Sequence, residues 1–155
     1  MNQAELQPVL LIEDEQTDVL LIREAFEKAG VQNPFLSVSH GDDALAWLEG
    51  VGQYSDRAKY PLPAFILLDL KLPGMHGLQL LKWIRSKRQL RIIPVVVLTS
   101  SADPSDIKSA YEAGANSYLM KPGDRKEIWR VVEIIQNYWL ALNVTPPLVL
   151  RASNQ

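Results

Sequence analysis

The chain has 155 residues, 47% hydrophobic and 22% charged, which fits one globular domain with an ordinary core and leaves no room for a second domain of usual size. Its formal net charge of −2 gives no general attraction to nucleic acid or to anionic membranes. Because cysteine is absent, the composition excludes disulfides, thiolate metal sites and cysteine nucleophiles.

Targeting and membrane signals are also missing from the sequence. No segment near the start joins basic residues to a long apolar stretch, which is the pattern of a secretory signal. No apolar run approaches the ~18 residues that a membrane-spanning helix needs. We therefore expect a cytoplasmic protein without a membrane partner.

Strand-like apolar runs alternate with segments of helical period, a pattern that predicts a parallel sheet covered by helices. The expected elements, strand and helix in turn, are residues 9–12, 17–29, 35–39, 42–49, 65–69, 77–86, 93–99, 104–113, 117–120 and 124–143. Five strands and five helices in strict alternation give a doubly wound, flavodoxin-like α/β fold.

Residues that favour helix ends mark several of these boundaries. Thr17 is a candidate N-cap for the first helix, and Asp103 with Pro104 supplies the N-cap and first-turn proline of the fourth. Gly30 and Gly50 follow the first and second helices, where glycine commonly ends a helix.

Two segments lie outside the alternating pattern. Residues 51–63 are rich in Gly, Tyr and Pro and form a long connection, which we interpret as a surface excursion. Residues 144–155 lack helical periodicity and form a C-terminal tail that is partly disordered or lies on a neighbouring surface. We expect a single domain over residues 1–155, with its core at about 6–143.

Polar side chains follow four of the expected strands. Glu13 and Asp14 come after the first strand, Asp69 after the third, Thr99 ends the fourth, and Lys121 follows the fifth. Parallel strands bring these ends to one edge of the sheet, where open α/β folds bind ligands. Three carboxylates, a hydroxyl and an ammonium in one crevice suit a hard divalent cation and a phosphoryl group.

These strand ends resemble the motifs of response-regulator receiver domains of the chemotaxis-regulator type. The matching stretches, in order along the chain, are residues 12–15, 68–77, 97–100 and 118–122, and the resemblance covers roughly residues 6–143. It implies a sheet in the order 2-1-3-4-5 and a stand-alone regulator of a two-component phosphorelay. In that role Asp69 accepts a phosphoryl group from a sensor histidine kinase, and the protein catalyses only its own phosphorylation and dephosphorylation.

The metal expected at this site is Mg²⁺, which is usually held by one or two carboxylates, waters and a phosphate. Asp14 and Asp69 suit direct ligation, and Glu13 suits contact through water. The resemblance adds the backbone carbonyl of Lys71 as a ligand. Helix capping is the structural alternative for Glu13 and Asp14, and the nearby Asp69 argues against it.

The remaining site residues serve the phosphoryl group and its signal. Lys121 is expected to contact a phosphoryl oxygen opposite the metal, and Thr99 to donate its hydroxyl to another. The resemblance implies a cis bond between Lys121 and Pro122. It also implies that Tyr118 swings inward when Thr99 moves; a half-buried strand aromatic is the alternative for Tyr118.

The last helix carries more apolar surface than one sheet face covers. At about 100° per residue, one stripe faces the sheet: Ile128, Val131, Val132, Ile135, Trp139 and Leu142. Ile134 and Tyr138 extend it along one flank, which needs cover from the tail or from a second copy in a homodimer. The family often dimerises through the fourth helix, fifth strand and fifth helix, and the long final helix resembles regulators of bacterial phytochrome kinases.

Other conspicuous residues receive structural interpretations. His40 and His76 lack metal-site spacing, although His76 borders the expected site. The cationic cluster of Lys82, Arg85, Lys87, Arg88 and Arg91 is interpreted as a solvated helix end, because cations are favourable there.

Three functions were compared. The leading one is the phosphoacceptor regulator, acting on an unidentified downstream protein. The alternative is a receiver-shaped adaptor that works without phosphorylation, against which the full set of site residues argues. A phosphatase of the haloacid-dehalogenase type normally has a second Asp two residues after its nucleophile, where this chain has Lys71. No DNA-reading module follows the expected domain, so direct nucleic-acid binding is not expected.

Overall fold

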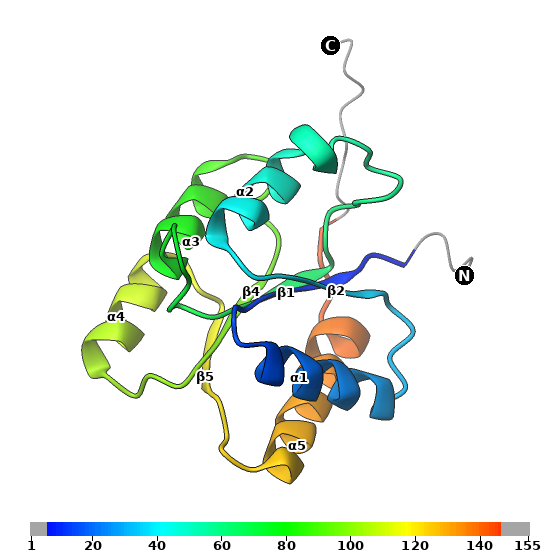
Figure 1. Cartoon of the computed structure of the whole chain (residues 1–155), viewed down its shortest axis with the longest axis vertical. Helices are drawn as coiled ribbons and strands as arrows, with labels where there is room; N and C mark the ends of the chain where they lie inside the picture. Colours follow the sequence, from blue (N-terminus) through cyan, green and yellow to red (C-terminus); the bar gives the residue numbers. More distant parts are fainter. Residues whose placement is uncertain (1–5, 147–155) are drawn as a thin grey trace.

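A computed structural model describes residues 6–146 as a five-stranded parallel sheet with helices on both faces (Figure 1). The strand order is β2-β1-β3-β4-β5, which confirms the expected fold and topology. The strands are β1 (Val9–Ile12), β2 (Phe35–Val38), β3 (Phe65–Leu68), β4 (Val95–Thr99) and β5 (Ser117–Met120).

Helices α1 and α5 cover one face of the sheet, and α2, α3 and α4 cover the other (Figure 1). Their bounds are α1 (Gln16–Lys28), α2 (Gly41–Glu49), α3 (Gly77–Ser86), α4 (Pro104–Glu112) and α5 (Arg125–Gln136). A short 3₁₀ turn, η2 (Gly52–Tyr54), follows α2, and a π-helical segment, η3 (Asn137–Leu142), continues α5.

The central strands are buried on both faces, which explains why their sequences are continuous apolar runs. Every residue of β1, β3 and β4 is buried. Alternate side chains of β1 enter opposite layers: Leu10 packs among residues of α2 and α3, and Leu11 among residues of α1 and α5. The sheet therefore separates two apolar layers, and in these three central strands polar residues occur only at the strand ends.

The first helix begins earlier than expected. Its first helical hydrogen bond runs from the Val19 amide to the Glu15 carbonyl, so Glu15 is the N-cap residue and Thr17 lies inside the first turn. The interpretation of Thr17 as the N-cap was wrong. The Glu15 side chain makes no capping hydrogen bond.

The last helix changes its winding near its end. The Asn143 amide donates to the Tyr138 carbonyl five residues earlier, at 2.6 Å, which is the π-helical spacing. This winding brings Leu140 against the layer formed with α1 and leaves Leu142 73% exposed. Placing Leu142 in the buried stripe was therefore wrong, because that stripe assumed α-helical spacing to Asn143.

The connection at residues 51–63 is more than a surface excursion. Tyr54 and Leu62 are buried, and the Tyr54 ring stacks on Trp47 with centroids 5.4 Å apart. Tyr60 meets both rings edge-on, at 5.2 and 5.0 Å. The segment is therefore packed onto α2 by aromatic side chains.

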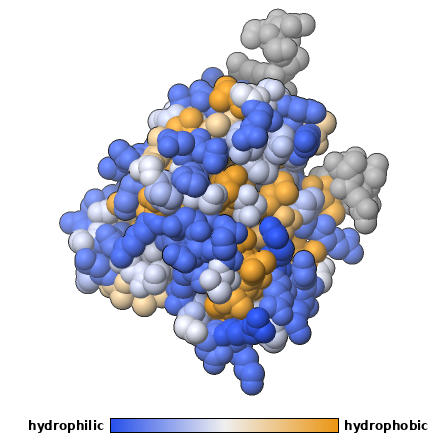
Figure 2. Space-filling model, in the orientation of Figure 1, coloured by the Kyte–Doolittle hydropathy of each residue, from blue (hydrophilic) through white to orange (hydrophobic). Residues whose placement is uncertain are grey.

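Hydrophilic residues cover most of the face shown in Figure 2, with hydrophobic residues confined to smaller patches. Within residues 6–146, none of the helices has the length and hydrophobicity needed to cross a bilayer. The expected tail lies mostly outside the described residues, which end at Pro146.

The start of α3 is capped by a histidine. His76 Nδ1 accepts from the Leu78 amide at 3.2 Å, and Gln79 Oε1 accepts from the His76 amide at 3.3 Å. This reciprocal pair satisfies two amide groups that a helix start otherwise leaves without partners. His76 is thus assigned to helix capping, and its Nδ1 must be unprotonated to accept that bond.

We predict that His76→Ala lowers the free energy of unfolding by about 1 kcal/mol, because it removes an N-cap acceptor. His76→Asn should retain most of the stability, since asparagine is a good N-cap residue. Urea denaturation followed by circular dichroism measures both. His40→Ala is the matched control, because His40 precedes α2 in the same way but makes no capping bond. Equal losses for His40→Ala and His76→Ala would contradict the assignment.

Candidate functional site

Four strand ends meet at one edge of the sheet and carry the expected polar residues. Backbone hydrogen bonds continue past the strand ends: the Asp69 amide donates to the Ile12 carbonyl at 3.0 Å, and the Lys121 amide donates to the Thr99 carbonyl at 2.8 Å. The backbone of Asp69 and Lys121 is therefore held by the sheet itself, although both residues lie just beyond its strands.

Glu13, Asp14 and Asp69 form an acidic cluster in which one oxygen from each lies within 4.8 Å of the others. Glu13 is 1% exposed and Asp69 is 6% exposed, whereas Asp14 is partly exposed. Glu13 Oε2 is buried and has no hydrogen-bond partner in the described part of the chain. A buried carboxylate oxygen without a donor is suited to a proton or a cation.

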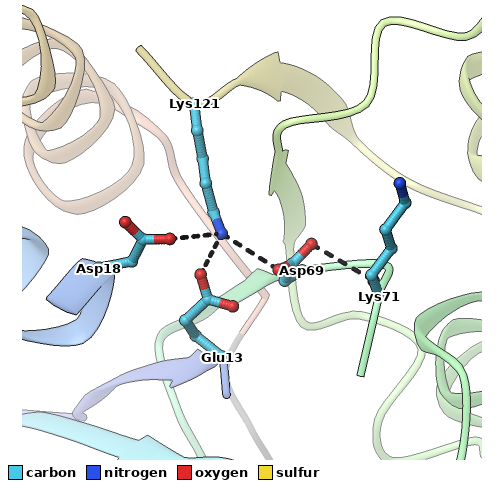
Figure 3. Close-up of polar contacts among 5 residues, drawn as sticks. All are labelled: Glu13, Asp18, Asp69, Lys71 and Lys121. Atoms are coloured by element: carbon cyan, nitrogen blue, oxygen red, sulfur yellow. Dashed lines mark hydrogen bonds and ion pairs between the residues drawn. The ribbon is translucent and has the colours of Figure 1, made fainter. Parts of the chain in front are cut away.

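Lys121 enters this cluster from the end of β5 (Figure 3). Its ammonium donates to Asp69 Oδ2 at 3.1 Å, to Asp18 Oδ2 at 3.0 Å and to Glu13 Oε1. The Lys121 side chain is only 12% exposed. All three donors of the ammonium are thus directed to carboxylates, and these bonds outweigh the effect of burial and raise the pKa of Lys121.

Asp18 is a site residue that sequence reasoning missed. It lies in the first turn of α1, and its carboxylate points to Lys121 in Figure 3. Acidic residues in a first turn are common for reasons of helix stability alone, so Asp18 carries no distinct sequence signal. Its position could have identified it, because α1 begins beside the edge at which Glu13 and Asp14 lie, so a residue in the first turn of α1 is close to them.

Crowding of the two buried carboxylates shifts their pKa values in opposite directions. Burial raises the pKa of Glu13, and the adjacent Asp69 carboxylate raises it further. Burial also acts to raise the pKa of Asp69, but the adjacent Glu13 and the charge of Lys121 outweigh it, so the pKa of Asp69 is lowered. Glu13 is thus the group that takes up a proton, while Asp69 stays ionised and nucleophilic.

Thr99 and Tyr118 connect the edge to the loop after β4. The Thr99 hydroxyl is buried and lacks a hydrogen-bond partner within residues 6–146. The Tyr118 hydroxyl donates to the Ser101 carbonyl at 2.8 Å, and its ring packs beside Leu70 and Ala110. Tyr118 therefore holds the loop that begins two residues after Thr99.

One expected feature of the site was wrong. The Lys121–Pro122 bond is trans, and no peptide bond in residues 6–146 is cis. The trans form of an X-Pro bond is favoured by about 0.5–1 kcal/mol, and the Lys121 ammonium reaches its carboxylates without the cis isomer.

The Lys71 backbone lies at the cluster. The Lys71 amide donates to Asp69 Oδ1 at 3.3 Å (Figure 3), and the Lys71 side chain is exposed. Its amide thus helps to orient the Asp69 carboxylate.

The interpretation of the cationic cluster as a solvated helix end was wrong for Arg85. The Arg85 guanidinium donates to the carbonyls of Gly114, Arg91 and Ile93 and to Asn116 Oδ1, at 2.7–3.1 Å. Burial lowers the pKa of Arg85. Arg85 thus joins the end of α3 to the segments before β4 and β5, whereas its cationic neighbours are exposed.

The family model for the response regulator receiver domain matches residues 9–133. Over 141 residues the chain is 40% identical to the probable methanogenesis regulatory protein FilR2 of Methanothrix harundinacea, spanning 89% of this chain and 86% of that protein. It is 34% identical over 138 residues to response regulator Rcp1 of Synechocystis, spanning 89% and 92%.

Two solved structures are similar over most of this chain. The phosphorylated cyanobacterial phytochrome response regulator RcpA superposes with a TM-score of 0.86 at 33% identity, covering 92% of this chain and 99% of that one. The Mn²⁺-bound form of Rcp1 superposes with a TM-score of 0.83 at 33% identity, covering 91% and 99%.

We predict that Lys121→Ala retains or raises the affinity of the acidic cluster for Mg²⁺, whereas Asp18→Asn lowers it. Without its ammonium, Lys121→Ala leaves the oxygens of Glu13 and Asp69 free for the metal, so affinity is retained or raised. Asp18→Asn removes a negative charge and frees Lys121 to pair with those oxygens, so affinity falls by roughly two- to fivefold. Isothermal titration calorimetry measures both.

Glu112→Gln on exposed α4 is the control for removing one carboxylate charge, and it should leave Mg²⁺ binding unchanged. A severe loss of Mg²⁺ affinity in Lys121→Ala would show instead that Lys121 holds the carboxylates in a binding geometry.

Proposed function

This chain belongs to the response regulator receiver domain family, and we propose that its acidic edge accepts a phosphoryl group on Asp69 from a sensor histidine kinase. One observation carries the assignment to Asp69: its carboxylate is buried, has a lowered pKa and lies 3.1 Å from the Lys121 ammonium beside Glu13 and Asp14. The chain acts in this role as a phosphoacceptor and turns over no separate substrate.

We infer that Mg²⁺ is the resident metal. The residues fit it, because Glu13 Oε2 is buried with no donor from residues 6–146 and the cluster supplies only oxygen ligands. Asp14 and Asp69 would bind it directly, Glu13 through water, and the Lys71 carbonyl would complete the protein ligands. A bound Mg²⁺ neutralises charge on the transferring phosphoryl group. The relative Rcp1 has been solved with Mn²⁺, which supports this assignment.

The chain's own residues account for the rest of the transfer. A carboxylate oxygen of Asp69 attacks the phosphorus of a phosphohistidine, the N–P bond breaks, and its electron pair stays with the histidine nitrogen. The product is an acyl phosphate on Asp69. Lys121 then exchanges a carboxylate partner for a phosphoryl oxygen, and the buried Thr99 hydroxyl acquires its first acceptor.

The same events supply a switch. Movement of Thr99 toward the phosphoryl group displaces the end of β4, and Ser101 lies two residues further on. Because Tyr118 is bonded to the Ser101 carbonyl, a shift of that loop changes the packing of Tyr118 against α4. We propose this two-state change as the signal to a downstream protein.

We propose more specifically that the chain is a single-domain regulator paired with a phytochrome-type kinase. RcpA is a phytochrome response regulator and matches this chain over 99% of its own length, so both sequences have receiver size. One receiver domain over residues 1–155, with its core at 6–143, is part of this proposal.

We predict that Asp69→Asn abolishes phosphorylation while leaving the fold intact, because the substitution removes the nucleophile but is nearly isosteric. The measurement is the gain of one phosphoryl group by mass spectrometry after incubation with Mg²⁺ and acetyl phosphate. Asp43→Asn, at a half-exposed position in α2, is the matched control and should still be phosphorylated. Phosphate on the Asp69→Asn protein, or phosphorylation that survives chelator, would show that the site is elsewhere.

In addition to the kinase, we propose a second copy of the chain as a partner, in a homodimer formed through the last helix. Ile134 is 58% exposed and Tyr138 is 50% exposed, with Met120 of β5 also 50% exposed. The Tyr138 ring meets Trp139 edge-on at 4.8 Å, which holds an aromatic anchor at the surface. Exposed aromatic and aliphatic anchors of this kind dominate many protein interfaces.

We predict that Ile134→Glu combined with Tyr138→Glu yields a folded monomer, since both changes place charge in the apolar contact. Sedimentation velocity at tens of micromolar, with and without phosphodonor, measures the assembly. Leu20→Glu on α1 is the control, because Leu20 is 62% exposed and lies outside this surface. An unmodified protein that is monomeric under both conditions contradicts the dimer.

A further inference from the structure

A cavity of about 260 Å³ lies between the C-terminal ends of α2 and α3. These helices lie side by side (Figure 1). Since the helices run antiparallel to the strands, their C-terminal ends are at the edge of the sheet opposite Asp69. The cavity is therefore separate from the phosphorylation site. Its apolar lining comes from Leu48, Trp83 and Leu90, of which Trp83 is the most exposed.

Arg57 forms one wall of this cavity and comes from the 51–63 connection. Its guanidinium donates to the carbonyls of Trp47 at 2.6 Å, Leu48 at 2.7 Å and Tyr60 at 3.2 Å. All three acceptors are neutral, and no carboxylate in residues 6–146 pairs with Arg57 within 4.0 Å. Burial lowers the pKa of Arg57, so its charge is partly desolvated and without a counter-ion.

Two more cations line the same cavity. Lys87 and Arg88 follow α3 directly, are exposed, and make no ion pair in the described part of the chain. The Lys87 ammonium lies 5.6 Å from the centroid of the Trp83 ring. Cations at a helix C-terminus are favourable by themselves, which accounts for Lys87 and Arg88 singly. It does not account for their convergence with Arg57, which lies some thirty residues earlier in the chain.

The local charge is positive in a chain whose net charge is −2. Three cations and one acid, Glu49, line the cavity, which gives 3 − 1 = +2. The two helix C-termini each contribute roughly −0.5, so about one positive charge remains. A site with exposed cations on its rim and a tryptophan in its wall attracts ligands that are both acidic and apolar.

We propose that this cavity binds an acidic segment of a protein partner. One carboxylate of the segment lies between Arg57 and the Lys87–Arg88 pair, and an apolar side chain packs on Trp83. A peptide is favoured over a free metabolite because Lys87 and Arg88 are exposed, so that they reach a chain that extends beyond the cavity.

The test is a titration of the ¹⁵N-labelled full chain with an acetylated hexapeptide of five glutamates and one phenylalanine. Chemical-shift changes should centre on the Trp83 indole N–H and the Arg57 Nε–H. A peptide with glutamine in place of glutamate should not bind, and added salt should weaken the acidic peptide. Lys87→Glu combined with Arg88→Glu should weaken binding by roughly tenfold or more, because two attractive contacts become repulsive.

Lys82→Glu combined with Lys126→Glu is the matched control, because it makes the same charge change at exposed positions outside the cavity. The control should bind the peptide almost normally, and both double variants should still be phosphorylated by acetyl phosphate. The proposal is overturned if the peptide does not bind at millimolar concentration, if the shifts map elsewhere, or if both double variants bind alike. It is also overturned if inorganic pyrophosphate binds the cavity more tightly than the peptide, since the site would then serve a small anion.

Discussion

Crowded negative charge at one edge of the sheet is the constraint on which the site depends. Parallel pairing brings the ends of β1 and β3 together, so Glu13 and Asp69 are buried side by side and cannot both stay ionised without a cation. Lys121 supplies that charge, assisted by a proton on Glu13. A divalent metal at the same edge would compete with Lys121 for these oxygens. In the phosphoryl transfer proposed above, Lys121 would leave its carboxylates for a phosphoryl oxygen.

A change in the partners of Lys121 can reach Tyr118 through β5, because this strand is only four residues long. Lys121 follows that strand immediately, and Tyr118 lies within it. The Tyr118 hydroxyl holds the loop after β4, which ends in Thr99, and the Thr99 hydroxyl has no hydrogen-bond partner within residues 6–146. In the proposed switch, a charge change at Asp69 would act on two adjacent strand ends at once, through Lys121 and through Thr99. Tyr118 would be the side chain at which both displacements meet, which suits a cooperative change better than a graded one.

Sequence patterns predicted the features that depend on periodicity. They failed for side chains whose positions are set by tertiary packing. The convergence of Glu13, Asp69 and Lys121 follows from apolar runs that end in polar residues, whereas the strand order was implied by the resemblance to receiver domains. Asp18 escaped notice because an acid in a first helical turn has an ordinary explanation. Leu142 was misplaced because one π-helical segment rotates every later side chain. Arg85 was taken for a solvated cation, since its four acceptors come from segments far apart in the sequence. The cis bond before Pro122 was implied by the resemblance alone, and the chain has the trans bond.

The net charge of the chain is small, but the two opposite edges of the sheet carry charges of opposite sign. Carboxylates collect where the strands end, and cations collect where α2 and α3 end, because the helices run back across the sheet. The packed 51–63 segment contributes to this polarity, since it carries Arg57 to the end of α2 and is held there by Tyr54 and Tyr60, which pack on Trp47. An acidic partner at the cationic end would not overlap the oxygens that meet the kinase. The fold therefore allows two partners at once, with the sheet as the rigid body between them.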